Sequence, residues 1–301
     1  MTANETTTTT QPALAADGLN VRYLTKYGVV DAVRDATVVV HPGEAVGIVG
    51  ESGSGKSTLA AACIGMLQVQ MLNRTPVEFD GTLQIVGHDV AGLSGRGWQN
   101  IRGRRVGYVG QDPFAALNPV LRVRQHMNEA LRHRPKRERE RLAVELLHAV
   151  ELPPETMAAF PHELSGGMRQ RVAIAMGVAD GPELLIADEP TTALDVTTQA
   201  EILKLLATLR SRGGMALLLI SHDLGVIGQV CDRIYVMYDG RVVEDGSTDQ
   251  VLYSPQHPYT RGLLKSARLE RDSSGYFEEG MRRSRTAVGA DAGLTVEGEA
   301  R

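Results

Sequence analysis

Short apolar runs separated by turns organise the first part of the chain. Leu19 to Tyr23 and Thr37 to Val40 have the pattern of strands in a β layer, and Pro42-Gly43-Glu44 makes a turn into the apolar run Ala45 to Val49. That run ends in a glycine-rich loop, and Thr58 to Leu67 then has the composition of an Ala-rich helix. The predicted order is therefore strand, loop, helix.

Strands and helices alternate again after a long helical stretch. Two further strands are predicted at Thr82 to Val86 and Arg105 to Val109, and the pattern from about Pro113 to Ala179 is mainly helical. Glu183 to Ala187 and Met215 to Ser221 are then predicted as strands on either side of another helix. This alternation is typical of a parallel sheet with crossover helices.

A turn signal follows in the last third of the chain. Ile234 to Tyr238 and Val242 to Glu244 flank Asp239-Gly240, a pair typical of tight turns, so a hairpin is predicted here. From about His257 the regular pattern fades, and we expect the end of the chain to be weakly structured.

Composition and charge indicate a globular protein with a substantial core. The 301 residues are 43% hydrophobic, and 36 Asp plus Glu against 32 Lys plus Arg give a formal net charge of -4, so no nucleic-acid partner is expected. The most charged stretch, Arg132 to Arg141, precedes Leu142, Leu146 and Val150 at helical spacing. This pattern favours a solvated helix face, with a basic binding patch as the alternative.

The sequence gives little indication of a membrane-spanning segment, a signal peptide or a disulfide. The longest strongly apolar stretch, Ala216 to Ile220, is far shorter than the ~18 to 20 residues of a membrane-spanning helix. The tract Thr6 to Thr10 lies in a polar N-terminus that lacks the features of a signal peptide, so the cytoplasm is the expected location. Cys63 and Cys231 stand in apolar surroundings without metal-ligand spacing, and we expect two buried thiols and no disulfide.

The loop after the apolar run matches the phosphate-binding pattern at every fixed position. Its residues are Gly50, Glu51, Ser52, Gly53, Ser54, Gly55, Lys56 and Ser57, followed by Thr58. Glycines let backbone N–H groups turn toward phosphates, Lys56 places positive charge on the β- and γ-phosphates, and the Ser57 hydroxyl can hold Mg²⁺. A chance glycine-rich turn is the alternative, which the flanking strand and helix disfavour. The loop therefore predicts nucleotide binding.

Two adjacent carboxylates, Asp188 and Glu189, end the predicted strand that begins at Glu183. Because side chains alternate along a strand, the two project from opposite sides of its end and can take different roles. Asp188 suits contact with Mg²⁺, and Glu189 suits orienting and deprotonating an attacking water. Alone, such a strand end is also typical of a solvated loop entry, but after a complete phosphate loop it predicts hydrolysis.

A third motif, Leu164 to Gln170, precedes the apolar helix Val172 to Val178. The Ser165 hydroxyl and the backbone N–H groups of a helix N-terminus favour an anion. An ordinary Ser cap followed by glycines is the alternative. The position of the motif between the phosphate loop and the acidic strand favours the anion site.

Together these motifs resemble those of the ABC ATPases, over roughly Leu19 to Leu264. The hallmarks in chain order are the phosphate loop, Gln111 after a strand, the Leu164 to Gln170 signature, Asp188-Glu189, Ala193-Leu194-Asp195, and His222 after another strand. The resemblance implies an α/β fold with a P-loop NTPase (RecA-like) core, an N-terminal antiparallel β layer and an inserted helical subdomain. The expected organisation is a disordered tail over 1–16, a first part of the ATP-binding core over 17–112, the helical subdomain over 113–180, a second core part over 181–256 and a weakly structured extension over 257–301.

The resemblance also implies roles for single residues. Gln111 would sense Mg²⁺ and water, and His222 would contact the γ-phosphate. Asp195 would lie at a dimer seam, where Ser165 and Gly167 of the signature face the phosphate loop of another subunit, so that neither chain alone completes a site.

One aromatic residue has two possible roles. Tyr27, just before Gly28, resembles the residue that stacks on adenine in this family, with a simple β-turn tyrosine as the alternative.

Within the family, three segments resemble the branch that powers oligopeptide, dipeptide and nickel uptake. They are Gln111-Asp112-Pro113 continuing to Leu117-Asn118-Pro119, Ser165 to Arg171, and His257-Pro258-Tyr259-Thr260. Met168 departs from the Gln that is commonest there in the wider family, but Met is frequent in this branch. Many branch members also carry a cysteine-bearing C-terminal extension, whereas this chain has no cysteine after Cys231, so no iron–sulfur role is expected for its tail.

The resemblance implies an importer ATPase that uses ATP and Mg²⁺ on the cytoplasmic face of the cell membrane. Its expected partners are two transmembrane permease subunits, a second ABC ATPase subunit in a heterodimer and, indirectly, an extracytoplasmic solute-binding protein. One alternative is a soluble ABC ATPase of a non-transport complex, acting on nucleic acid or in phosphonate breakdown. A second alternative is a subunit that binds ATP without hydrolysing it. This alternative is disfavoured because Lys56, Glu189, Ser165 and His222 are all present.

Overall fold

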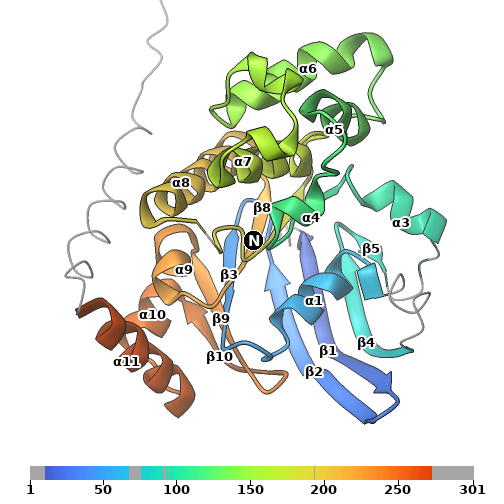
Figure 1. The fold of residues 1–301 in the computed structure, drawn as a ribbon. Helices are drawn as coiled ribbons and strands as arrows, with labels where there is room; N and C mark the ends of the chain where they lie inside the picture. The colour runs from blue at the N-terminus through green and yellow to red at the C-terminus, as the bar shows by residue number, and fades with distance from the viewer. Residues whose placement is uncertain (1–10, 68–75, 91–92, 94, 193, 273–301) are drawn as a thin grey trace, which may run out of the picture.

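The computed structural model describes residues 11–67, 76–90, 93, 95–192 and 194–272. Over these residues the chain forms two sheets and a helical segment that lies beyond one end of the larger sheet (Figure 1). The predicted α/β class with a β layer and an inserted helical part is confirmed.

The smaller sheet has four antiparallel strands in the order β2-β1-β4-β5. Their bounds are β1 (Leu14–Thr25), β2 (Gly28–Val40), β4 (Val77–Ile85) and β5 (His88–Asp89). The predicted strands at Leu19 to Tyr23 and Thr37 to Val40 are the inner parts of β1 and β2.

β1 corrects the predicted tail of residues 1–16, because the strand already begins at Leu14. Leu14 and Ala16 are fully buried, and Leu14 pairs with Val40 on one side and Ile85 on the other. The pairing with β2 shifts register between Ala16 and Leu19, so the apolar alternation breaks there. That break hid the first residues of the strand from the sequence pattern.

The larger sheet has six strands in the order β10-β9-β3-β8-β7-β6, all parallel except β10. Their bounds are β3 (Ala45–Val49), β6 (Val106–Val109), β7 (Leu184–Asp188), β8 (Ala216–Ser221), β9 (Arg233–Tyr238) and β10 (Arg241–Ser247). The predicted β9–β10 hairpin is confirmed, with Asp239 and Gly240 in its turn, both at positive φ.

The helices complete the core on both faces of this sheet. Their bounds are α1 (Lys56–Cys63), α3 (Gly95–Ile101), α4 (Pro113–Ala116), α5 (Val123–Ala130), α6 (Lys136–Ala149), α7 (Gly166–Gly177), α8 (Val196–Gly213), α9 (Leu224–Val230), α10 (Thr248–Tyr253) and α11 (Pro258–Asp272), with short 3₁₀ turns at Pro154–Ala158 and Pro161–Glu163. α1 begins two residues before the predicted Thr58, directly after the glycine-rich loop.

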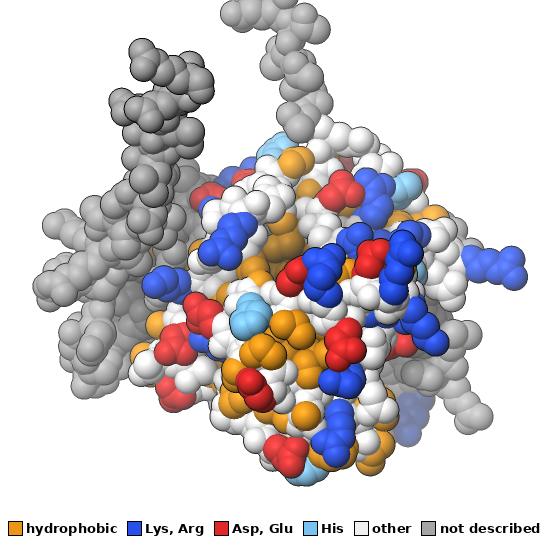
Figure 2. Space-filling view, turned by 90° about the horizontal axis from the view of Figure 1, so that it is seen from above, with side chains coloured by type: hydrophobic (Ala, Val, Ile, Leu, Met, Phe, Trp, Pro, Cys, Tyr) orange, Lys and Arg blue, Asp and Glu red, His pale blue; other side chains and the backbone are white. Residues whose placement is uncertain are grey.

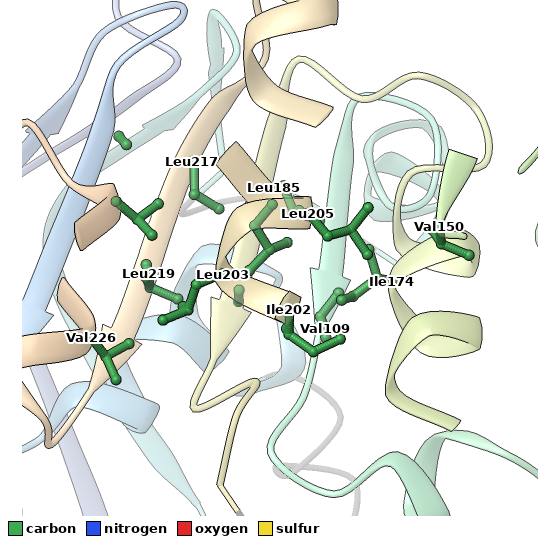
Figure 3. Packing of buried hydrophobic residues seen from close by; sticks show 14 of the residues in the cluster. Val109, Val150, Ile174, Leu185, Ile202, Leu203, Leu205, Leu217, Leu219 and Val226 are labelled. Atoms are coloured by element: carbon green, nitrogen blue, oxygen red, sulfur yellow. The ribbon is translucent and has the colours of Figure 1, made fainter. Parts of the chain in front are cut away.

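Each parallel strand divides its side chains between two hydrophobic clusters. In β3, Val46 and Ile48 join the cluster formed with α1 and the smaller sheet, whereas Ala45 and Val49 join the one formed with α7, α8 and α9. Figure 3 shows the second cluster, where Leu203 of α8 packs beside Leu219 of β8. Burial on both faces explains why these strands are continuous apolar runs.

Several charged residues of the helical segment between β6 and β7 form ion pairs. Arg132, Arg134 and Arg141 pair with Glu129, Asp180 and Glu145, respectively. In the view from this end of the molecule, Lys and Arg side chains lie among Asp and Glu (Figure 2). The solvated helix face predicted for Arg132 to Arg141 agrees with this arrangement better than a basic patch does.

The C-terminal prediction needs a second correction, because α11 continues the fold over Pro258–Asp272. Thr260 and Leu264 of this helix are 0% and 4% exposed, so the segment is docked on the body of the protein. Gly262 and small polar residues weaken its helical signal in the sequence. Residues 273–301 of the predicted extension, like the Thr6 to Thr10 tract and Ala193, lie outside the described residues.

Candidate functional site

The glycine-rich loop lies between the end of β3 and the start of α1. Gly55 caps α1 with φ +101°, and a Cβ placed there would lie 2.3 Å from the carbonyl oxygen of Ala32. Gly53 has φ +82° with open space around it. No side chain caps the helix, so the backbone N–H groups of its first turn remain available to an anion. Glycine is therefore required by conformation at Gly53 and also by space at Gly55.

Lys56 is held inside the loop with only 4% of its surface exposed. Its ammonium donates to the carbonyl oxygens of Gly50, at 2.8 Å, and Glu51, at 2.7 Å. Burial lowers the pKa of Lys56, while the nearby carboxylates Glu189 and Asp188 act in the opposite direction. The ammonium group of Lys56 thus lies at the centre of the loop.

Backbone contacts fasten the loop to segments that are distant in sequence. Gly240, in the hairpin turn, donates its N–H to the carbonyl oxygen of Ser54 at 3.1 Å and accepts from the N–H of Arg34 at 2.8 Å. At the other end of the loop, the N–H of Glu51 donates to the hydroxyl of Tyr259 at 3.0 Å. The loop is therefore connected to β2, to the β9–β10 turn and to α11.

Asp188 ends β7 directly beside the start of α1. The hydroxyl of Ser57 donates to Oδ1 of Asp188 at 3.3 Å, and the phenol of Tyr108 in β6 also hydrogen bonds to this carboxylate. Burial raises the pKa of Asp188, which its hydrogen bond to Ser57 and the charge of Lys56 partly oppose. Burial together with the Asp188 charge raises the pKa of Tyr108 to about 12. A hydroxyl and a carboxylate oxygen thus lie side by side as hard oxygen donors.

Three side chains converge on one oxygen of Glu189. Nε2 of Gln111 donates to Oε2 at 3.1 Å, the hydroxyl of Thr192 donates to it at 2.9 Å, and Nδ1 of His222 lies 3.3 Å from it. Glu189 itself adopts φ +47°, an uncommon conformation for a non-glycine residue, and its N–H donates to the carbonyl oxygen of Ile220. The two carboxylates therefore point to different partners, as the strand alternation predicted.

A cavity of about 1270 Å³ joins these groups. Its walls include the phosphate-loop residues from Gly50 to Thr58 other than Ser54, together with Gln111, Glu189, Thr192 and His222. Part of β2, including Val29, Val30, Asp31 and Arg34, and residues of α11 between Tyr259 and Ala267 line the same cavity. The structure thus brings the predicted loop, Gln111, Glu189 and His222 together.

The signature residues lie outside this cavity. Ser165 caps α7 and accepts from the N–H of Met168 at 3.2 Å, and Asp195 caps α8 and accepts from the N–H of Thr198 at 3.0 Å. Hydrogen bonds from Thr198 lower the pKa of Asp195. The two helix starts are adjacent, because a Cβ at Gly167 would lie 2.6 Å from the side chain of Thr198.

Tyr27 also lies outside the lining of the cavity. It sits between β1 and β2 with 88% of its surface exposed, and the ammonium of Lys26 lies 4.9 Å from the centre of its ring. Val29 and Val30, two and three residues further on, line the cavity instead.

Two general features of the described residues are relevant to the site. They include no cluster of three or more His, Cys, Asp or Glu side chains that would form an all-protein metal centre. None of the helices in the described part of the chain is long and apolar enough to cross a membrane.

Three residues at or beside the cavity were not predicted from the sequence. Thr192 and Tyr108 touch the two carboxylates, and Tyr259 touches the phosphate loop. Thr192 stands three positions after Glu189, a spacing that could have indicated it. Tyr259 belongs to the His257-Pro258-Tyr259-Thr260 segment, whose sequence marks the importer branch but gives no sign of a contact with the loop.

Comparison with known proteins agrees with this geometry. A family model described as ABC transporter matches residues 33–192. The oligopeptide transport ATP-binding protein OppD of Bacillus subtilis is 45% identical over 259 residues, covering 84% of this chain and 71% of that protein. The dipeptide transport ATP-binding protein DppD of the same organism is 41% identical over 261 residues, covering 85% and 77%.

Among solved structures, a dimeric, post-hydrolysis ATP-binding cassette bound to ADP and Pi aligns with a TM-score of 0.67 and 28% identity, covering 78% of this chain and 98% of that one. The resemblance drawn from the motifs is thereby confirmed. With its phosphate loop, acidic strand end and signature helix in one fold, the chain belongs to the ABC transporter family of ATPases.

Proposed function

We propose that this chain is the ATP-hydrolysing subunit of an ABC importer and that it energises peptide uptake. The observation that carries the proposal is the convergence of Gln111, Thr192 and His222 on Glu189, in the cavity that also contains the phosphate loop. A carboxylate held in this way at the γ-phosphate end of a nucleotide site fits hydrolysis rather than binding alone.

The loop residues bind the phosphates in this proposal. The backbone N–H groups from Gly50 to Thr58, with those at the N-terminus of α1, would bind the phosphates, and Lys56 would offset part of their charge. Because Lys56 already lies within hydrogen-bonding distance of two loop carbonyls, a small movement of its ammonium would exchange them for phosphate oxygens.

Mg²⁺ is the metal that fits the oxygen donors beside the loop. Ser57 would hold the ion, Asp188 would contact it directly or through its ligands, and the amide oxygen of Gln111 would complete the protein's contribution. Bound ATP would supply the γ-phosphoryl group and Mg²⁺ the positive charge that offsets its developing negative charge.

Glu189 is the proposed general base, and Gln111 and His222 orient it. Glu189 would take a proton from the attacking water at its carboxylate, and His222 would also contact the γ-phosphate. The side chain of Glu189 is 15% exposed, and that of His222 is 60% exposed. The base is therefore sheltered, whereas the histidine faces the open side of the cavity.

A second ATPase subunit would complete the site. Ser165 and Gly167 of the signature, and Asp195 at the seam, lie outside the cavity of their own chain, so they are free to face the phosphate loop of a partner. The similar solved cassette is a dimer, which supports a two-subunit site. The adenine-stacking role of Tyr27 stays a prediction.

The proposed substrate class, peptides, is based on the names of the similar proteins. Their names describe oligopeptide and dipeptide transport, which supports a peptide importer over a non-transport complex and over nickel uptake. We propose that the chain lies on the cytoplasmic face of the membrane with two permease subunits, a second ATPase in a heterodimer and an extracytoplasmic binding protein.

Reconstitution tests this function. The full chain would be purified with its membrane partners, placed in vesicles and supplied with peptide and ATP on the appropriate sides. We expect peptide uptake that requires ATP and is lost in Glu189→Gln. ATP hydrolysis without uptake of any peptide would contradict the importer assignment, and absence of hydrolysis in the complete assembly would contradict the ATPase assignment.

A further inference from the structure

One stripe of α11 lines the same cavity as the phosphate loop. Its members are Tyr259, Gly262, Leu263, Ser266 and Ala267, which all belong to the cavity wall. Their spacing of three, one, three and one positions places them on a single face of the helix. Apart from Tyr259 and Leu263 the stripe is made of small residues, which leave the space beside it open.

The helix is fixed in this orientation by its own start. The carboxylate of Glu244 in β10 accepts from the N–H of Gln256 at 2.6 Å and from the N–H of His257 at 3.0 Å. On another face of the helix, Thr260 and Leu264 are buried, and Leu264 is part of the larger hydrophobic cluster. The stripe is therefore positioned by the residues just before α11 and by the packing of α11 on the cluster, to which Tyr259 and Leu263 also contribute.

Tyr259 connects this helix directly to the phosphate loop. Its hydroxyl accepts the N–H of Glu51 at 3.0 Å, across 208 positions of sequence. Its ring lies 4.4 Å from that of Tyr238, tilted by 40°. The ring pair and the hydroxyl contact together fix the distance between α11 and the first residues of the loop.

The chemistry of the wall differs from that of the rest of the cavity. Phosphate-binding N–H groups, Lys56 and the catalytic carboxylate come from the loop, α1 and the end of β7. By contrast, β2 contributes Val29, Val30 and Ala32 together with the charged Asp31 and Arg34, and α11 contributes a phenol, Leu263 and small side chains. The α11 wall has no charged side chain, and a wall of this kind suits the base and ribose of a nucleotide rather than its phosphates.

We propose that α11 forms a wall of the nucleotide pocket, with Tyr259 as a positioning residue that holds the start of the phosphate loop against it. The proposal rests on the ATP-binding function of the cavity and adds the C-terminal helix to the site. The ligand is the nucleoside part of the same ATP. Tyr259 acts through the loop and has no chemical role in hydrolysis.

The first test compares two single-hydroxyl deletions in the full chain. Tyr259→Phe keeps the ring pair and removes the hydroxyl that accepts the Glu51 N–H. Tyr238→Phe is the control, because it removes the other hydroxyl of the pair and Tyr238 does not line the cavity. ATP binding would be measured by titration with a fluorescent ATP analogue, and thermal unfolding would be measured without nucleotide.

We expect Tyr259→Phe to weaken nucleotide binding about three- to tenfold, the range of one ordinary hydrogen bond. Its unfolding temperature without nucleotide should match that of Tyr238→Phe, and KM for ATP should rise more than kcat falls. Equal affinity in Tyr259→Phe, Tyr238→Phe and the unmodified chain would overturn the positioning role. Failure of the unmodified chain to bind nucleotide would instead overturn the proposed function as well.

The second test probes the wall itself. Ser266→Trp fills the stripe with a large ring, and Lys265→Trp places the same ring one position away, where Lys265 is exposed and does not line the cavity. We expect nucleotide affinity to fall at least about tenfold in Ser266→Trp and to be unchanged in Lys265→Trp. The reason is that the new ring would displace the nucleoside from the apolar surface that it would otherwise bury. Equal affinities in these two variants would show that the nucleotide does not reach α11 and would overturn the proposal that this helix forms a wall of the nucleotide pocket.

Discussion

The hydroxyl of Ser57 lies 3.3 Å from a carboxylate oxygen of Asp188, although 131 positions separate the two residues along the chain. The parallel sheet makes this contact, because β3 and β7 both pair with β8 and end at the same edge. α1 starts at that edge, so the first hydroxyl of the helix meets the last carboxylate of the strand.

Asp188→Asn should weaken the response of the ATPase to Mg²⁺. The substitution keeps a hydrogen-bonding partner for Ser57 but removes the negative charge, so we expect about ten- to 100-fold more Mg²⁺ to be required for half-maximal hydrolysis. The measurement is phosphate release during a Mg²⁺ titration at saturating ATP. Asp245→Asn, on exposed β10, is the control, and an identical Mg²⁺ requirement in both variants would exclude a metal-linked role for Asp188.

Glu189→Gln should separate binding from turnover. The amide cannot take a proton from water, so hydrolysis should fall by about 10² to 10⁴-fold while ATP binding is retained. Phosphate release and nucleotide titration would be measured on the same preparation, and gel filtration with ATP should show a longer-lived dimer. Glu140→Gln, at an exposed position of α6, should hydrolyse ATP normally. Unchanged hydrolysis in Glu189→Gln would remove Glu189 as the base.

Gly55→Ala should destabilise the protein more than Gly53→Ala. Both glycines have positive φ, which costs an L-residue about 1 to 2 kcal/mol, but only at Gly55 would the new methyl group lie 2.3 Å from a backbone oxygen, that of Ala32. We expect the free energy of unfolding to differ between the variants by at least about 1 kcal/mol. Urea unfolding of the two variants gives this difference directly, and equal values would mean that the loop relaxes around the added atom.

Both cysteines should be inert in the folded protein. Cys63 and Cys231 are buried, and burial raises the pKa of the Cys63 thiol to about 12 and that of Cys231 further still. A thiol-alkylating reagent at about pH 8 should therefore modify neither cysteine of the native chain and both in denaturant, as counted by mass. Fast modification of the native protein would show that one of them becomes exposed.

The docking of α11 should depend on pH through Glu244. Its burial disfavours the charged form, but hydrogen bonds from the backbone N–H groups of Gln256 and His257 help to outweigh this effect, so the pKa of Glu244 lies below its ordinary value of 4.5. A lowered folded-state pKa stabilises the protein above about pH 4.5, and this stabilisation is lost as the pH falls through the folded-state value.

Glu244→Gln should therefore lower the unfolding temperature most near neutral pH, and its difference from the unmodified chain should shrink as the pH falls below about 4.5. Glu140→Gln serves again as a control whose effect should be small at every pH, because its side chain is exposed. A difference that grows on acidification would contradict the assigned sign.

The elements with strong local signals were predictable from the sequence. The phosphate loop, the strand that ends in Asp188 and the Asp239-Gly240 turn each depend on neighbouring residues, and all three are present in the structure. The two faces of the parallel sheet were less visible, because strands buried on both sides show no alternation.

The missed features depend on contacts between distant segments. The first residues of β1 are stabilised by pairing with Val40 and Ile85, whereas their own alternation is interrupted. α11 presents small residues to the cavity, so its apolar stripe is incomplete, and the contact of Tyr259 with Glu51 has no local signature. Sequence patterns therefore located the chemistry better than they located the elements that support it.

The contacts that fasten the phosphate loop also affect the entropy of ATP binding. Gly240 holds Ser54, Tyr259 holds Glu51, and Lys56 spans the interior, so the loop is already shaped before any phosphate arrives. Ordering a flexible backbone costs about 1 to 2 kcal/mol per residue, and here that cost is met during folding rather than at each binding event. A motor that must bind and release nucleotide in every cycle thereby avoids ordering and melting its loop each time.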